Sequence, residues 1–546
     1  MNLRMEKNNL DQHKGFKLIS LELVGHNILG SNTFNFVDPL DKPESIYTTV
    51  IIGPNGTGKS ELLSVILYIF RNICSLDLND SFDYISGRYR LKYKNNNTIY
   101  EISNITDGLN FQSLTGKKVI FPRPKFFRNS EEIDFNKAIN TLPEAIVANS
   151  IMLTDKFIVP RNDKEQSQFP MYKYLGVRNR PSQASTRSYV RKTIEFVVDQ
   201  IESKVFKEGL EKIADYLGLS KSISVIYYTT NTPKFFTGNL NKKNLDDYFA
   251  KIDKQYAGKE QIAPFKLSNY KAIVKNDPKY IEQLCDFINS LIRHKRLYPV
   301  YNSSAKIISY DVTENSSHKR LRSEYRHLDI MRRIGLLKPP EIKFGQRKSD
   351  EIENLISGYF THHNNIDLQD TSSGEFHFFS TMVGLMATVK PNSLILIDEP
   401  EISLHPNWQM QYLQFVRQLF SDDVYQTCHI IIATHSHFLV SDLKEPSSKI
   451  IGLNKIEGRI GTKDINTNTF GWSAEDILYN IFNVRSSLNY YLEADLTELL
   501  GLIAMNSKDI MRLKEILDKL VKLPQRDNDP LQEIILEAKD YIKQLE

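Results

Sequence analysis

Eight consecutive residues have the types and spacing needed to hold a chain of phosphate groups. Residues 53–60 read Gly-Pro-Asn-Gly-Thr-Gly-Lys-Ser and fit the pattern G-x-x-x-x-G-K-[ST]. An apolar segment at 48–52 precedes them, and residues 61–73 carry apolar side chains at helical spacing. Glycines let backbone N–H groups converge on phosphate oxygens, and the start of the helix adds a favourable dipole. The sequence therefore predicts a phosphate-binding loop between a strand and a helix.

The expected roles within this loop follow from the side chains. Lys59 reaches the β and γ phosphates of ATP, and the Ser60 hydroxyl holds Mg²⁺. The residues expected to bind the nucleotide are Gly53, Asn55, Gly56, Thr57, Gly58, Lys59 and Ser60.

A second carboxylate for magnesium stands far along the chain. Residues 394–397 are apolar and lead into Asp398 and Glu399. We expect Asp398 to bind the Mg²⁺ shell and Glu399 to orient or activate the attacking water. Because 339 residues separate Lys59 from Asp398, we expect a domain-sized insertion between the two halves of one nucleotide-binding fold.

The elements that must position these residues are those of an α/β protein. The strand at 394–397, an amphipathic helix from about residue 406 and the apolar strand at 429–434 predict a parallel sheet. We expect residues 1–125 and 346–485 to form the two halves of an ATPase head. Residues 126–345 are expected to form a mostly helical insertion, and 486–546 a helical tail with helices at about 488–523 and 530–545.

Further motifs carry a family resemblance. The run Ser-Ser-Gly-Glu at 372–375 resembles the signature motif of ABC-type ATPases. The block at 398–406, Asp-Glu-Pro-Glu-Ile-Ser-Leu-His-Pro, resembles that of the OLD and Rad50 heads, and Ala-Thr-His-Ser at 433–436 resembles their switch-histidine loop. The resemblance implies a mixed sheet flanked by helices and a head-to-tail dimer. In that dimer Ser373 and Gly374 contact the γ-phosphate from the partner, and His435 contacts it within its own subunit.

A narrower resemblance concerns residues 142–157, 172–178 and 471–484, which are similar to segments of PtuA-type ATPases of Septu anti-phage systems. The family joins its ATPase to an HNH nuclease, PtuB, and retron versions add a reverse transcriptase with its small DNA–RNA hybrid, msDNA. This resemblance implies a regulatory subunit that holds the nuclease inactive until infection. No glutamine matches the family's Q-loop, and Ser150 or Asp155 stands at that position.

Two other classes of protein compete with this interpretation. A DNA-repair or structural-maintenance head of the RecF or Rad50 sort is the first, although the insertion lacks long heptads. The second is an OLD-type ATP-dependent nuclease. The D-x-D at 527–529 lies in a Gln-Arg-Asp-Asn-Asp-Pro sequence with no apolar strand before it, so we interpret it as a turn and expect no nuclease centre in this chain.

Composition limits the setting in which the protein acts. The 546 residues include 70 basic and 66 acidic side chains, so a nucleic-acid partner does not follow from the net charge of +4. Basic residues nevertheless gather at 173–192 and at 293–333, where nucleic acid could bind. Three scattered cysteines, a polar N-terminus and no long apolar run predict a cytoplasmic protein without a signal peptide or membrane span.

Overall fold

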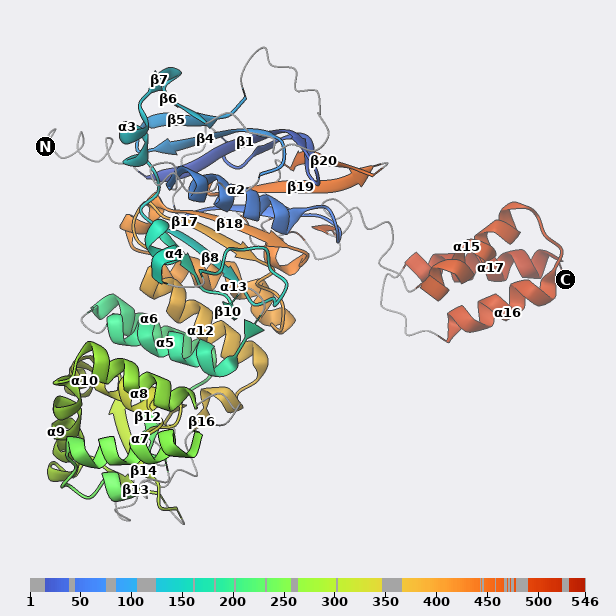
Figure 1. Cartoon of the computed structure of the whole chain (residues 1–546). Helices are drawn as coiled ribbons and strands as arrows, with labels where there is room; N and C mark the ends of the chain where they lie inside the picture. The colour runs from blue at the N-terminus through green and yellow to red at the C-terminus, as the bar shows by residue number, and fades with distance from the viewer. Residues whose placement is uncertain are drawn as a thin grey trace, which may run out of the picture. The chain divides into compact units, whose positions relative to one another are not determined.

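The structure is a computed structural model of the whole chain (Figure 1). It describes residues 15–545 except 39–44, 75–84, 106–123, 161–162, 181–182, 201–202, 231–232, 257–263, 301–302, 346–365, 442, 444–445, 457, 466–468, 470–471, 473–475, 478–489 and 523–529. The D-x-D at 527–529 and most of the block at 471–484 lie outside these residues.

The chain forms two compact units, residues 1–471 and 472–546. The second unit begins somewhat before the expected tail at 486. Each unit has its own core, and each is described by itself.

A seven-stranded sheet runs through the centre of the first unit, in the order β20-β19-β3-β18-β17-β8-β9. All neighbours are parallel except β19 and β20, which are antiparallel. β17 and β18 are buried along their whole length, as expected for strands covered on both faces. The strands are β3 (Tyr47–Ile52), β8 (Ile146–Ser150), β9 (Tyr172–Tyr174), β17 (Leu394–Asp398), β18 (His429–Thr434), β19 (Ser448–Ile456) and β20 (Arg459–Ile465).

A second, antiparallel sheet has the order β2-β1-β4-β5-β6-β7. Helix α2 (Lys59–Cys74) lies between the two sheets (Figure 1). Its apolar residues share one core with both sheets, because Leu63 and Phe70 belong to the same buried cluster as Leu21 and Leu396. The strands are β1 (Phe16–His26), β2 (Gly30–Asn35), β4 (Arg88–Asn95), β5 (Thr98–Ser103), β6 (Lys125–Arg128) and β7 (Glu131–Ile133).

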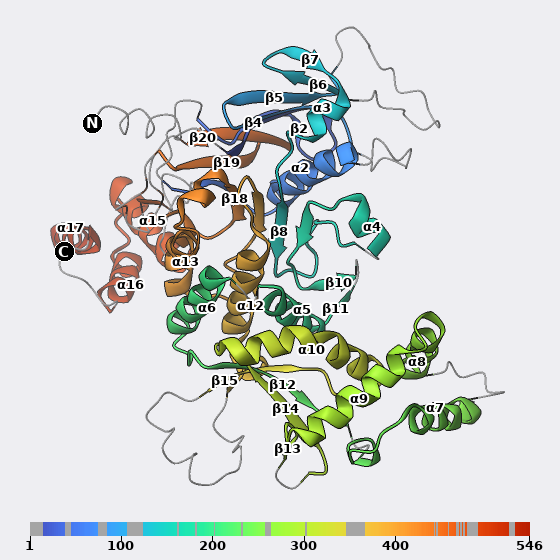
Figure 2. The same cartoon turned by 90° about the vertical axis from the view of Figure 1, so that its left-hand side faces the viewer.

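Helices cover the face of the central sheet that is turned away from α2 (Figures 1 and 2). They are α5 (Thr186–Asp199), α6 (Lys204–Tyr216), α12 (Ser373–Thr388) and α13 (Pro406–Leu419). Aromatic side chains join them: Tyr216 of α6 packs on Phe378 of α12 and on Phe415 of α13, with ring centroids 5.0 and 4.5 Å apart. The predicted mixed sheet flanked by helices is therefore confirmed.

The middle of the chain differs from the expected mostly helical insertion in two respects. β8 and β9 pair within the central sheet and β6 and β7 within the antiparallel sheet, so the head continues past residue 126 to Tyr174. In addition, a five-stranded sheet, in the order β13-β14-β12-β15-β16, accompanies the helices. Its strands are only two to six residues long and are separated by polar segments, so the sequence pattern did not predict them.

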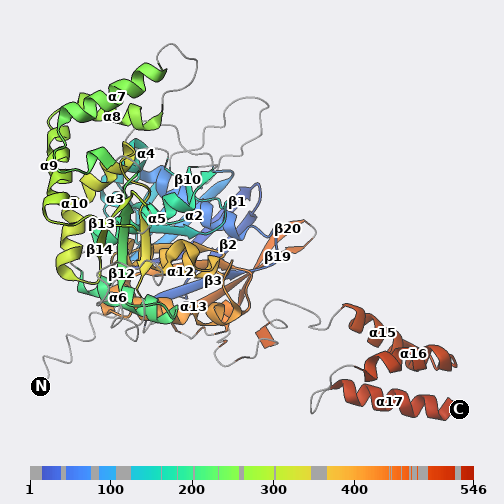
Figure 3. The same cartoon turned by 90° about the horizontal axis from the view of Figure 1, so that it is seen from below.

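Helix α10 packs on this five-stranded sheet (Figures 2 and 3). The strands are β12 (Ile223–Tyr228), β13 (Tyr298–Pro299), β14 (Lys306–Asp311), β15 (Glu341–Phe344) and β16 (Ile366–Asp367), and the helices are α7 (Lys242–Tyr256), α8 (Phe265–Asn276), α9 (Tyr280–Arg293) and α10 (Asn315–Arg333). Short elements elsewhere are α3 (Phe135–Ile139), α4 (Asp163–Gln168), β10 (Arg178–Arg180) and β11 (Gln183–Ala184).

The described part of the second unit includes the helices α15 (Tyr490–Ala504), α16 (Ile510–Val521) and α17 (Pro530–Leu545), seen together in Figure 3. The helix expected over 488–523 is therefore wrong, because the chain turns at Asn506, whose φ of 51° ends the first helix. Leu499, Ile516 and Ile542, one from each of these helices, lie in one buried cluster, so the helices share a core within the unit.

No helix in the described part of the chain is long and apolar enough to cross a membrane.

Candidate nucleotide site

The phosphate-binding loop lies where the sequence places it, between β3 and α2. Gly56 and Gly58 have φ angles of 79° and 85°, in the left-handed region that favours glycine. A Cβ on Gly58 would stand 2.6 Å from Cδ2 of Leu29. The Thr57 hydroxyl donates to the carbonyl of Pro54 at 2.8 Å and fixes the turn, while Asn55 is exposed at its tip.

Lys59 is folded into its own loop. Its ammonium donates to the carbonyl of Gly53 at 2.8 Å, and lies 2.7 Å from Nε2 of His435. Burial lowers the pKa of Lys59 to about 8, against the opposing effect of Glu399, Asp398 and Glu401. The ammonium therefore stands among three carboxylates, with carbonyl contacts that a phosphate chain can replace.

Ser60 and Asp398 are in contact although they lie on opposite sides of the insertion in the sequence. The Ser60 hydroxyl donates to Oδ1 of Asp398 at 2.9 Å. Asp398 ends the buried strand β17, and burial raises the pKa of its carboxyl to about 7. A hydroxyl and a carboxylate are the oxygen donors that Mg²⁺ takes in P-loop proteins, so these residues fit the ion.

Glu399 follows Asp398 in a strained conformation, with φ at 49°. A non-glycine residue in this region marks a functional position more often than a random one. Its Oε1 lies 3.1 Å from Nε2 of His435, and the hydrogen bond from His435 lowers the pKa of Glu399. Because Nε2 of His435 also faces Lys59, this nitrogen either accepts from the ammonium or donates to the carboxylate.

Glu401 also lies at this site, although the sequence analysis assigned it no role. Its Oε1 accepts from the Thr434 hydroxyl at 2.8 Å and from the backbone N–H groups of His435 and Ser436 at 2.7 and 3.2 Å. One carboxylate therefore fixes the loop that carries His435. The sequence signal that could have pointed to Glu401 is its position in the Asp-Glu-Pro-Glu block at 398–401.

The signature residues lie at the start of α12, as expected. Ser372 caps the helix: its hydroxyl accepts from the N–H of Glu375, whose side chain accepts from the N–H of Ser372. Ser373 is exposed and Gly374 is buried, with a virtual Cβ only 2.4 Å from the carbonyl of Ser403. The γ-phosphate contact from a partner subunit stays a prediction.

Asp155, one of two candidates for the Q-loop position, is held by other residues. Its carboxylate accepts from Nε of Arg178 at 2.9 Å and from the Tyr174 hydroxyl at 2.8 Å. Its charge contributes to the raised pKa of Asp398, so it stands close to the site without entering it. Ser150, the other candidate, ends β8 in register with Asp398.

The P-loop, Asp398, Glu399 and His435 lie at the carboxyl edge of the central sheet, where they follow the ends of β3, β17 and β18. The antiparallel sheet, the P-loop sequence, Asp398 and Glu399 after β17 and His435 after β18 give the chain the fold of an ABC-type P-loop ATPase head. Within the described residues no group of three or more His, Cys, Asp or Glu could hold a metal ion by themselves.

Comparison with known proteins agrees with this class. Residues 251–441 match the family described as "AAA domain, putative AbiEii toxin, Type IV TA system". The matched residues include the signature, the acid pair and the switch histidine. Over 497 residues the chain is 23% identical to a Vibrio cholerae protein, "Retron Vc95 probable ATPase", covering 89% of this chain and 81% of that protein.

Solved structures of ATPase heads also align. An Smc head from Pyrococcus furiosus aligns over 86% of this chain and all of that one, at 13% identity and a TM-score of 0.32. The recombination mediator RecF with ATP aligns over 83% of this chain and 99% of that one, at 11% identity and a TM-score of 0.27. These superpositions are loose.

Proposed function

We propose that this protein is an ATP-hydrolysing regulatory subunit of a bacterial anti-phage defence complex. The observation that supports it best is the convergence of Lys59, Ser60, Asp398, Glu399 and His435 from three distant segments. The residues have the types and order that ATP hydrolysis requires.

The chemistry assigned to each residue follows from its contacts. The loop N–H groups and Lys59 bind the β and γ phosphates, and Lys59 leaves the carbonyls of Gly53 and Pro54 to do so. Ser60 and Asp398 would hold Mg²⁺, and the ion would supply positive charge that neutralises the phosphates. Glu399 accepts a proton from the attacking water, and His435 orients this carboxylate and contacts the γ-phosphate.

Hydrolysis is tested with two variants. Lys59→Ala is expected to lose nucleotide binding, because it removes the cation that faces the phosphates. Glu399→Gln is expected to bind ATP but to turn it over roughly 100-fold or more slowly, because it removes the general base. Binding of a fluorescent ATP analogue and phosphate release are the measurements, and normal turnover in Glu399→Gln would refute the assigned role.

The retron association of this protein is proposed from its relative. The Vibrio cholerae protein is named as a retron ATPase, and it matches most of this chain. We propose a PtuA-like role with an HNH nuclease partner of the PtuB type, a reverse transcriptase and its msDNA. ATP binding closes two head-to-tail subunits, hydrolysis opens them, and this cycle controls what the nuclease can reach.

A tagged pull-down from the native host tests these partners. An HNH protein with a reverse transcriptase and msDNA in the eluate is the expected result. Repair factors in the eluate would instead favour a head of the RecF sort, and nuclease activity of the purified chain alone would favour an OLD-type enzyme.

A further inference from the structure

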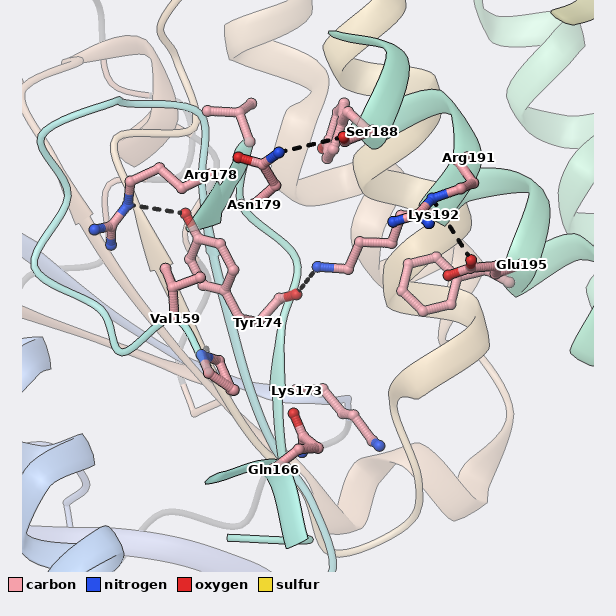
Figure 4. A pocket seen from close by; sticks show the side chains of 15 residues that line it. Val159, Gln166, Lys173, Tyr174, Arg178, Asn179, Ser188, Arg191, Lys192 and Glu195 are labelled. Carbon is pink, nitrogen blue, oxygen red and sulfur yellow. Dashed lines mark hydrogen bonds and ion pairs between the residues drawn. The ribbon is translucent and has the colours of Figure 1, made fainter. Parts of the chain in front are cut away.

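A second pocket lies between the β9–β10 segment and α5 (Figure 4). Its volume is about 270 Å³, near the lower end of the range for small-molecule sites. Lys173 and Arg178 line one side, and Ser188, Arg191 and Lys192 line the other. Four members of the basic cluster at 173–192 therefore line one pocket: Lys173, Arg178, Arg191 and Lys192.

Two of these cations, Lys173 and Lys192, form no ion pair with a carboxylate among the described residues. Lys192 donates to the carbonyl of Tyr174, and its side chain reaches across the pocket in Figure 4. Burial lowers its pKa to about 8, partly opposed by the charge of Glu195. In the described part of the chain neither Lys192 nor Lys173 lies within ion-pair distance of a carboxylate.

The other charges lining the pocket are already matched. Arg178 is bound to Asp155, and Nε of Arg191 lies 3.8 Å from Oε1 of Glu195. Lys192 is half-buried, donates to one carbonyl and has its Nζ over the Tyr174 ring, 5.2 Å from the centroid. Neither contact neutralises its positive charge, so a bound anion would stabilise it. Among the lining residues that the structure describes, Lys173 and Lys192 are therefore the two cations outside ion-pair distance of a carboxylate.

We infer that this pocket binds a terminal phosphate group, carried by a free nucleotide or by the end of a nucleic-acid strand. A terminal phosphate has a charge of about −1.5 to −2, which two ammonium groups match. An internal phosphodiester has a single charge and must leave the pocket on two sides. Asn179 and Ser188, whose side chains lie 3.3 Å apart, are further hydrogen-bonding groups that line the pocket.

The pocket also contacts the elements that hold the nucleotide site. Tyr174 and Arg178 bind Asp155, whose charge acts on Asp398. On the other side, the Tyr189 hydroxyl lies 3.3 Å from that of Thr381 in the signature helix α12. A ligand joining the two walls is therefore placed to alter ATP turnover; this coupling rests on the proposed function, whereas the binding does not.

Binding is tested on the full chain carrying Lys59→Ala, so that the P-loop does not compete. The probes are a labelled five-nucleotide oligothymidylate with a 5′-phosphate, the same strand with a 5′-hydroxyl, and thymidine 5′-monophosphate as competitor. We expect the phosphorylated strand or the monophosphate to bind at least about tenfold more tightly than the hydroxyl strand. The tighter of the two identifies the source of the phosphate.

Variants locate the site. Lys173→Gln and Lys192→Gln are expected to weaken the phosphate-dependent binding at least about tenfold. Lys204→Gln, whose side chain is 90% exposed on α6, is the matched control and leaves binding unchanged. Since Lys173 is exposed, its variant keeps the test decisive even if Lys192→Gln does not fold. Equal binding of both strands, no binding at all, or full binding by Lys173→Gln would overturn the inference.

The coupling has a separate readout. In the chain with Lys59 intact, the phosphorylated strand is expected to change ATP turnover, and Lys173→Gln is expected to remove this change. Turnover that is unaffected while binding persists would overturn the coupling alone.

Discussion

At the scale of single residues, one carboxylate of the candidate site positions a neighbouring loop. Glu401 holds three donors of the loop that carries His435. The positions of Lys59, Asp398 and Glu399 follow from sequence motifs, but this positioning does not, because it depends on how the ends of β17 and β18 meet.

Two variants of Glu401 separate its geometry from its charge. Glu401→Ala is expected to lower kcat by roughly 10- to 100-fold, the cost of losing hydrogen bonds to a charged acceptor, with little change in KM. Glu401→Gln keeps an oxygen acceptor and is expected to recover much of the activity. Steady-state phosphate release gives both constants, and equal loss in the two variants would show that the charge matters more than the loop.

At the scale of elements, the start of helix α12 lies close against the loop that follows β17. A Cβ on Gly374 would meet the carbonyl of Ser403, which is backbone and cannot give way without moving the loop after β17.

Gly374→Ala is therefore expected to lose most ATP turnover while the chain stays folded. Gly501→Ala is the matched control, because a Cβ in helix α15 meets nothing within 4 Å. This control is expected to keep full turnover and to stabilise its helix by about 0.5–1 kcal/mol. Phosphate release and thermal unfolding are the measurements; full activity in Gly374→Ala would mean that the loop can shift freely.

The junction of α10 with α5 has its own pH dependence. His318 is fully buried, and its ring lies 2.9 Å from the carbonyl of Val197, through Nε2. Burial lowers its pKa to about 4, so the unfolded chain binds the proton more readily. Stability is therefore expected to fall as the pH decreases from about 6.5 to 4, by up to about 3 kcal/mol.

Urea unfolding of the wild type and of His318→Gln across this range checks the assignment. The variant is expected to lose part of the slope, because glutamine can donate to Val197 without titrating. Parallel slopes in both proteins would assign the acid sensitivity to other groups.

Prediction from sequence succeeded for elements with strong local signals. It failed for short strands whose pairing depends on partners far away in the chain. The apolar runs at β3, β17 and β18 indicated a parallel sheet, and the P-loop lies between β3 and α2. Short strands such as β8 and β12 obtain their hydrogen bonds from partners far away in the chain, so their local pattern did not reveal the sheet to which each belongs.

At the scale of the whole molecule, the expected partner of the P-loop is the signature of a second copy. Ser373 is exposed at the capped start of α12 and so remains available to another subunit. The dimer makes a quantitative prediction, because each site would need Lys59 from one chain and Ser373 from the other.

Lys59→Ala and Ser373→Arg chains are each expected to be inactive alone. When they are mixed equally and allowed to exchange, half of the dimers contain one of each, and one of their two sites is intact. The mixture is therefore expected to recover about a quarter of wild-type turnover. No recovery, despite subunit exchange measured by energy transfer, would contradict a site shared between chains.

The order of strands in the central sheet also has a consequence in time. β3 lies between β18 and β19, so both of its neighbours are synthesised long after it. At about 5–20 residues per second, the ribosome needs roughly 20–75 seconds to pass from the end of β3 to the start of β18. For that interval the phosphate-loop strand emerges as a nascent segment with both edges unpaired, and the head closes only when translation is nearly complete.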